Sequence, residues 1–172
     1  IATVSSAGKV MNGSYRVNVT QLAEGVSMAS GGRIEEDTID EEGKVLGSDG
    51  QPITELNFTI NDGSHYFENG VKKYYDFEIA VENSNGVTMN DIVKAINSAK
   101  TADGKNAIKI HASYDAGIKR FFMQTTETGK DAEIKINIPQ GVETGEGEEP
   151  IGGIEERFFN GLNLQVNHYV YS

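Results

Sequence analysis

The sequence predicts an α+β fold, mostly β, in which antiparallel strands surround one short helix. Residues 88–97 carry the one clear helical pattern, and the segments on both sides alternate apolar and polar residues, as half-buried strands do. The 20 glycines and an apolar fraction of 37% indicate short strands joined by long turns. We therefore expect a β-β-α-β-β-β unit, a base of terminal strands, and long loops rich in glycine and acidic residues.

The predicted helix begins at Thr88. Its hydroxyl can accept a hydrogen bond from the amide of Asp91, and the Asp91 carboxylate can reach back, which makes a variant of the capping box. Apolar residues follow at the i, i+3, i+4 and i+7 spacing of one helix face: Met89, Ile92, Val93 and Ile96. Such a helix is expected to lie across a sheet and close a small core.

The chain before the helix alternates between predicted strands and polar turns. The strands expected there cover residues 15–20, 55–61 and 76–82. Residues 21–29 fit either one helical turn or a continuing edge strand. Glycines and acidic residues across 31–51 predict a solvated hairpin or loop. Turns are expected at Asn61-Asp62-Gly63 and at Asn69-Gly70, because these residue types tolerate positive φ.

After the helix, three short strands are expected in succession as an antiparallel meander: residues 107–113, 119–125 and 133–138. Residues 140–153 are the most linker-like part of the chain. The last ordered segment is expected at 161–171, with Leu162, Leu164 and Val166 on one face of a strand.

Two acidic, glycine-rich segments bracket the central unit. We therefore expect residues 1–51 and 139–172 to form a discontinuous base lobe with paired terminal strands, and residues 52–138 to form the α+β lobe. A domain whose ends leave side by side is typical of an insertion into a parent protein. The chain begins at Ile1 without an initiator Met or a leader-like segment, which favours a piece of a longer protein. Proximity of residues 15 and 165 would support this arrangement.

The composition argues against several classes of function. The net charge is −11 and the pI about 4.7, whereas binding to nucleic acid needs a concentrated basic face. The same charge disfavours attachment to an anionic membrane, and no apolar run approaches the ~20 residues that cross a bilayer. Because the chain has no Cys, disulfides, thiolate metal sites and a Cys nucleophile are excluded.

No motif for catalysis or metal binding emerges. The histidines, His65, His111 and His168, lack a ligand spacing, and His111 is expected to face solvent from a strand. The offsets of a calcium loop occur at Thr38, Asp40, Glu42, Gly43 and Asp49, but Thr occupies the first position and no helix flanks the loop. The pair Gly129-Lys130 lacks the glycines of a phosphate loop, and no serine elbow is present. We therefore expect a protein that is not an enzyme, with no catalytic, cofactor-binding or metal-binding residues and no cofactor.

Aromatic residues and asparagine triplets are weaker candidates. The aromatic residues are Tyr66, Phe67, Tyr74 and Tyr75. They could form a platform for a carbohydrate or a protein, but their alternating neighbours favour packing in the core and turns. Three asparagines, Asn12, Asn18 and Asn57, stand in N-x-S/T triplets, which would indicate glycosylation in a secreted animal protein.

The helix and its surroundings resemble the flagellin hook IN motif of bacterial flagellins and of the filament cap protein, hook-associated protein 2. The resemblance rests on Thr88–Asn97, on Phe77, Ile79 and Val81 before it, and on residues 107–110, 117–123 and 125–129 after it. Residues 13–23 are similar to the strand that opens the outer domain of cap proteins. Together these segments cover about half of the chain.

The resemblance leaves the choice between flagellin and cap protein open. Cap proteins usually continue into an Asp-Ala…Asn-Gly segment that this chain lacks. Residues 161–166 resemble the Leu-Gln-Ile/Val-Gly run of flagellins, although Asn167 stands where the glycine would be.

What the resemblance implies is an extracellular, non-catalytic structural outer domain, exposed on the flagellum to host surfaces and antibodies. Its partners would be other flagellar subunits, contacted through stem regions outside residues 1–172, with no nucleic acid and no membrane insertion. The alternative is a glycan- or protein-binding module of a bacterial surface adhesin that uses residues 65–75.

Overall fold

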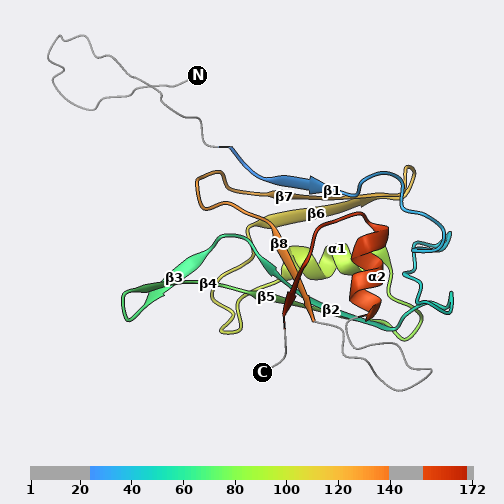
Figure 1. The fold of residues 1–172 in the computed structure, drawn as a ribbon, viewed down its shortest axis with the longest axis horizontal. Coiled ribbons are helices and arrows are strands. Elements are labelled where there is room, and N and C mark those ends of the chain that lie inside the picture. The colour runs from blue at the N-terminus through green and yellow to red at the C-terminus, as the bar shows by residue number, and fades with distance from the viewer. Residues whose placement is uncertain (1–23, 140–152, 170–172) are drawn as a thin grey trace, which may run out of the picture.

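The protein is described here by a computed structural model, which covers residues 24–139 and 153–169 (Figure 1). Strands predominate and two short helices accompany them, so the α+β, mostly β fold is confirmed. The elements in chain order are β1 (Ser27–Ala29), β2 (Glu55–Asn61), β3 (His65–Glu68), β4 (Val71–Tyr74), β5 (Phe77–Glu82), α1 (Met89–Ser98), β6 (Ile110–Asp115), β7 (Arg120–Thr125), β8 (Lys135–Pro139), α2 (Gly153–Gly161) and β9 (Asn167–Tyr169).

The described strands form three sheets. One has the order β1-β7-β6, the second β5-β2-β8-β9, and the third is the hairpin β3-β4. All pairings are antiparallel except that of β8 with β9. Helix α1 contacts both β5 and β6, and it lies between the two larger sheets in Figure 1. The core therefore sits between two sheets and is filled by this helix.

Helix α1 has the cap and the apolar face that the sequence predicts. Thr88 is extended, with φ −101° and ψ 159°, and its hydroxyl accepts the Asp91 amide while the Asp91 carboxylate accepts the Thr88 amide. Met89, Ile92 and Ile96 are each 1% exposed. The capping box is confirmed, and the stripe is buried at three of its four positions, since Val93 is only partly buried.

Alternation explains the strands that cover this helix. In β5, residues Phe77, Ile79 and Val81 are buried while the residues between them are exposed. Its neighbour β2 buries Leu56, Phe58 and Ile60 in the same way, and Phe58 lies opposite Ile79. The predicted strands at 55–61 and 76–82 are therefore confirmed.

The antiparallel meander expected after the helix is wrong. Strands β6 and β7 do form a hairpin, with Ile110 opposite Thr125, but β8 pairs with β2 and not with β7. The connection after β7 carries the chain across to the second sheet. There Ile136 and Ile138 of β8 are almost fully buried in the core. Burial of these side chains favours the second sheet as the partner.

For the segment 31–51 the expected solvated hairpin or loop is only partly correct. Its acidic residues are mostly exposed, but Ile34, Ile39 and Val45 are at most 1% exposed. The Val45 amide donates to the carbonyl of Val87 at 2.8 Å. The segment is therefore a packed layer of the core with a polar outer surface.

Helix α2 was not expected from the sequence. It buries Phe158 and Phe159, and the Phe159 ring meets Phe58 of β2 edge to face, with centroids 5.0 Å apart. The strand expected across 161–171 is wrong in its first half, because Leu162 and Leu164 follow the helix in a bonded turn. Among the described residues 161–169, the strand is β9.

The predicted pairing of terminal strands concerns residues that lie partly outside the description. Residues 15–20 are not among those described, so the two-lobe division and the proximity of residues 15 and 165 stay predictions. For 21–29 the edge strand is confirmed at β1, which pairs with β7. Buried residues from 31–51, α1 and α2 belong to one hydrophobic cluster. Neither described helix is long and apolar enough to span a bilayer.

Candidate functional site

The hairpin of β3 and β4 is largely exposed, and we call it the aromatic arm (residues 65–74). It continues the β2–β5 hairpin beyond the sheet and projects from the body of the molecule (Figure 1). The register shifts at the joint, because Ile60 lies opposite Phe77 whereas His65 lies opposite Tyr74. Four residues of one strand therefore oppose two of the other, which bends the arm out of the sheet.

The joint is held by polar contacts and by a close backbone approach. Asn61 Nδ2 donates to the Tyr75 carbonyl at 2.9 Å, and the Tyr75 amide donates to the Ser64 carbonyl at 2.9 Å. Gly63 has a φ of +83°, and a Cβ there would lie 1.5 Å from the carbonyl oxygen of Asp131. Only glycine fits this position, so the predicted turn at Asn61-Asp62-Gly63 is confirmed with a steric reason.

The tip of the arm is the predicted turn at Asn69-Gly70. Asn69 has a φ of 51° and Gly70 a φ of 79°. Two consecutive positive φ values between paired strands are typical of the tight two-residue hairpin turn, whose twist matches that of the strands. The arm therefore has a defined register up to its tip.

The arm carries most of the exposed large hydrophobic residues of the described chain. Of the five large hydrophobic residues exposed in the described chain, four lie on it: Phe67 (68%), Val71 (59%), Tyr74 (47%) and Tyr66 (37%). The expectation that the aromatic residues pack in the core is therefore wrong for all but Tyr75, which is half-buried against it. Strands β3 and β4 were not expected from the sequence. They form a separate two-stranded sheet, and most of its side chains are exposed.

One face of the arm is formed by His65, Phe67, Lys72 and Tyr74, which the register places side by side. The His65 ring lies edge to face with Phe67 at 5.8 Å and with Tyr74 at 6.1 Å. Lys72 Nζ lies 4.9 Å from the centre of the Tyr74 ring. The three rings therefore contact one another, while Phe67 and Tyr74 stay exposed to solvent.

The opposite face is built around Tyr66, whose ring lies 4.9 Å from that of Tyr75. Beside it, Lys73 pairs with Glu68 across the hairpin. Val71 completes this face. Tyr66 is thereby fixed to the joint, while Val71 stays exposed to solvent.

The cations of the arm have partners. Lys72 Nζ lies 2.9 Å from Asp131 Oδ1 in the loop between β7 and β8. The hydrogen bond with Asp131 raises the pKa of Lys72, and the same bond lowers the pKa of Asp131. Lys73 is likewise paired, with Glu68. A partner would therefore meet mainly aromatic side chains on the arm, because both lysines are already in ion pairs.

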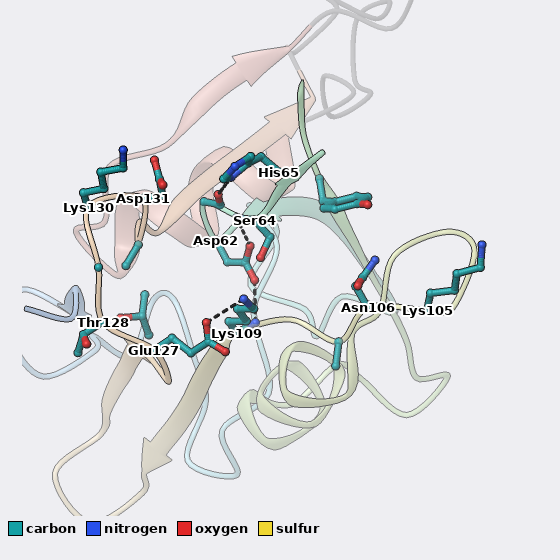
Figure 2. A pocket seen from close by; sticks show the side chains of 16 residues that line it. Asp62, Ser64, His65, Lys105, Asn106, Lys109, Glu127, Thr128, Lys130 and Asp131 are labelled. Atoms are coloured by element: carbon teal, nitrogen blue, oxygen red, sulfur yellow. Dashed lines mark hydrogen bonds and ion pairs between the residues drawn. The ribbon is translucent and has the colours of Figure 1, made fainter. Parts of the chain in front are cut away.

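A groove of about 650 Å³ lies at the foot of the arm (Figure 2). The 62–65 turn, residues 105–109 before β6, and residues 125–132 after β7 form its walls. Asp62 is 3% exposed, and its carboxylate accepts the Ser64 amide at 2.8 Å and the Lys109 amide at 2.7 Å. Lys109 Nζ reaches Glu127 at 2.8 Å.

Asp62 therefore has a structural role, because each of its two carboxylate oxygens accepts a hydrogen bond from a main-chain amide. These bonds tie the joint of the arm to the start of β6. Figure 2 shows Lys105 and Asn106 on one side of the groove and Lys130 and Asp131 on the other. The groove mixes both signs of charge, which selects no particular ionic ligand.

The structure does not bring the predicted metal candidates together. His65 lies on the arm, with Nδ1 3.2 Å from the Gly63 carbonyl, and His111 faces solvent on β6, as expected. Nothing is described for the side chain of His168. Asp40 Oδ1 accepts the amides of Glu42 at 2.9 Å and Lys44 at 2.8 Å, so it closes a turn. Among residues 24–139 and 153–169, no group of three acidic or histidine side chains could hold a metal ion.

Of the three N-x-S/T asparagines, Asn57 alone lies in the described chain. It sits within β2, where its backbone amide donates to the carboxylate of Glu155 at 3.1 Å. Glu155 is 8% exposed and was not singled out from the sequence. The sequence signal that could have drawn attention to Glu155 is that it stands three residues before Phe158 and Phe159.

Val71 also escaped the sequence analysis, although it belongs to the exposed patch of the arm. The Asn69-Gly70 turn contained the clue, because a tight hairpin brings residues 66–67 and 71–74 together. No family model, curated protein or solved structure matches this chain. The proposals for its function therefore rest on its own residues.

Proposed function

We propose that this chain is a non-catalytic structural outer domain of a bacterial flagellar filament protein, either a flagellin or the filament cap protein hook-associated protein 2. The supporting observation is that the segment resembling the flagellin hook IN motif forms one packed unit of β5, α1 and the β6–β7 hairpin. Within it Thr88 caps the helix, Ile96 is buried, and Asn97 bonds to the backbone of β6. Its most distinctive residues thus hold the fold together.

A stable core combined with an acidic surface is suited to a domain that is exposed on a filament. A structural domain needs a stable core and a soluble surface, and the net charge of −11 serves the second need. Under this proposal the domain is extracellular on the flagellum. It meets other flagellar subunits through stem regions outside residues 1–172, and its surface is open to antibodies and host surfaces.

A second candidate is a glycan- or protein-binding module of a bacterial surface adhesin. The aromatic arm favours it, because three aromatic side chains and Val71 are exposed on a braced hairpin. Exposed aromatic rings offer large, rigid contact area to a partner. The adhesin therefore competes directly with a purely structural role.

Immunogold microscopy of the source bacterium tests the first proposal, with antibodies raised against the 172-residue chain. Label along the whole filament identifies a flagellin, and label at the tip identifies the cap protein. Label on the cell body and never on flagella would contradict the flagellar assignment and favour the adhesin.

A glycan array tests the second candidate with three proteins: the wild type, Tyr74→Ala and Ile118→Ala. Ile118 is the matched control, because it is 51% exposed and belongs to the turn between β6 and β7, not to the arm. An adhesin should bind saturably, lose binding on Tyr74→Ala and keep it on Ile118→Ala. Absence of saturable binding by the wild type would rule out glycan recognition by the arm on the array tested.

A further inference from the structure

We propose that the tip of the aromatic arm is a site of spontaneous deamidation, at which Asn69 converts to aspartate and isoaspartate as the protein ages. The reaction consumes water and needs no enzyme. The inference concerns the arm alone and does not require the flagellar assignment.

Deamidation at an Asn-Gly pair begins when a backbone nitrogen attacks the side-chain amide. The nitrogen of Gly70 bonds to Cγ of Asn69, the Cγ–Nδ2 bond breaks, and Nδ2 leaves as ammonia with the proton of the Gly70 amide. Glycine favours this step, because it has no Cβ to hinder the approach of its nitrogen. Water then opens the cyclic imide at one of its two carbonyls. One opening gives aspartate, and the other gives isoaspartate, in which Cβ becomes a main-chain atom.

The described chain offers three Asn-Gly pairs, at Asn69, Asn85 and Asn160. Asparagine is a thermolabile residue type, and the sequence alone does not distinguish these three positions. Ring closure requires the backbone at the asparagine to rotate out of a regular turn or helix. The rate at each pair therefore follows how readily that segment opens.

The pair at the tip of the arm is held by few contacts. Asn69 and Gly70 are both exposed, and nothing lies within 4 Å of a Cβ built at Gly70. Among the described residues none accepts a hydrogen bond from the Gly70 amide. Phe67 and Val71 beside the turn are 68% and 59% exposed, so opening the tip uncovers little apolar surface.

The strands that carry the tip resist its opening only weakly. Strands β3 and β4 form a sheet of two strands, and such a hairpin is marginally stable in water. The ion pair between Lys73 and Glu68 spans the hairpin, but both side chains are about half exposed, and exposed pairs contribute little. The tip therefore opens without disturbing the core.

The other two pairs are held by the body of the protein. Gly86 is buried, its amide donates to the Asn83 carbonyl at 2.9 Å, and a Cβ there would lie 2.8 Å from Cβ of Pro52. Gly161 ends helix α2, and a Cβ there would lie 2.2 Å from Oγ1 of Thr38. Opening either segment disturbs packed neighbours. Both of these pairs are therefore protected, and the tip of the arm is not.

Isoaspartate at the tip alters the arm, because it lengthens the backbone of the turn by one atom. The two-residue turn sets the register of β3 and β4, with Glu68 opposite Val71. A longer turn does not fit this register, so the strands separate near the tip. Aspartate keeps the length of the backbone. Either product makes the net charge of −11 more negative by one.

Peptide mapping tests the proposal on the 172-residue chain. The folded protein is incubated in mildly alkaline buffer, and samples are digested with trypsin and analysed by mass spectrometry. Trypsin cleaves after Lys and Arg, which places the three pairs in different peptides, and fragment ions locate the modified residue. Deamidation at Asn69 should be at least ~10-fold faster than at Asn85 and Asn160, because the tip opens far more often. A rate at Asn69 as slow as at Asn160 would overturn the proposal.

Incubation in guanidinium chloride is the matched control, because all three asparagines precede glycine. In the unfolded chain the three rates should converge, with Asn69 changing least from its rate in the folded protein. Rates that differ as much in the unfolded chain as in the folded one would show that the structure does not select the site, and would overturn the proposal.

The effect on the arm has its own measurement. The isoaspartyl form, separated by ion exchange, should show faster amide exchange in β3 and β4 than the unreacted protein, with exchange in α1 unchanged. Equal exchange in β3 and β4 would contradict the loss of register at the tip.

Discussion

The side-chain amide of Asn97 in α1 forms two hydrogen bonds with the backbone of Ala112 in β6. Asn97 Nδ2 donates to the Ala112 carbonyl at 2.9 Å, and the Ala112 amide donates to Asn97 Oδ1 at 2.7 Å. Strand β6 is an edge strand of its sheet, and the Asn97 amide pairs with it as a neighbouring strand would. The helix is thus fastened to the sheet by a polar contact beside its apolar stripe.

Replacing Asn97 by Ala should lower the free energy of unfolding by about 1–3 kcal/mol, because Ala112 is 1% exposed and its amide and carbonyl would lose their partners. Urea denaturation followed by circular dichroism measures the change. Asn90→Ala is the control on the same helix, since Asn90 is exposed, and it should alter stability little. Equal stabilities of the two variants would show that the Asn97 contact contributes nothing.

The apolar stripe of α1 makes a separate prediction. Ile92→Ala and Ile96→Ala should each cost about 2–5 kcal/mol, because both side chains are 1% exposed between the two sheets. Val93→Ala should cost less, because Val93 is only partly buried. Denaturation midpoints that do not move for Ile92 and Ile96 would mean that the helix is peripheral to the core.

The parts of the fold that could be predicted from the sequence depend on neighbours along the chain. Thr88 and Asp91 are three residues apart, so the cap of α1 is visible in the sequence itself. Alternation likewise shows which face of β5 is buried. It does not show which strand becomes the partner, and so the pairing of β8 with β2 could not be inferred. That pairing is set by which isoleucines fill the common core.

The missed elements depend on contacts between distant residues. Nothing in residues 153–161 marks a helix start with a capping side chain, and Phe159 is buried because it meets Phe58 of β2. The exposure of the arm was missed for a similar reason. The register shift at the joint bends the hairpin outward, and at this joint Gly63 packs closely against the backbone of Asp131, far along the chain.

The capping box should make stability depend on pH. A hydrogen bond from the Asn83 amide, and then one from the Thr88 backbone amide, lower the pKa of Asp91 below its ordinary value of 3.8. Because the pKa is lower in the folded state, the carboxylate contributes stability above the unfolded value, and this is lost as pH falls through the folded pKa. Urea denaturation at several pH values below about 5 should therefore show a steeper loss for the wild type than for Asp91→Asn. Parallel curves would contradict the role assigned to Asp91.

Gly63 and Gly50 form a matched pair that isolates the steric role of the joint. Both have positive φ, +83° and +73°, so alanine at either position pays about 1–2 kcal/mol for the left-handed conformation. At Gly50 nothing lies within 4 Å of the added Cβ, whereas at Gly63 it would lie 1.5 Å from the Asp131 carbonyl oxygen. Gly63→Ala should therefore be clearly the less stable variant in urea denaturation. Amide exchange in β3 and β4 should also accelerate, because the arm is no longer held against the loop that contains Asp131. Similar stabilities for the two variants, with unchanged exchange in the arm, would show that the contact of Gly63 with Asp131 does not hold the arm in place.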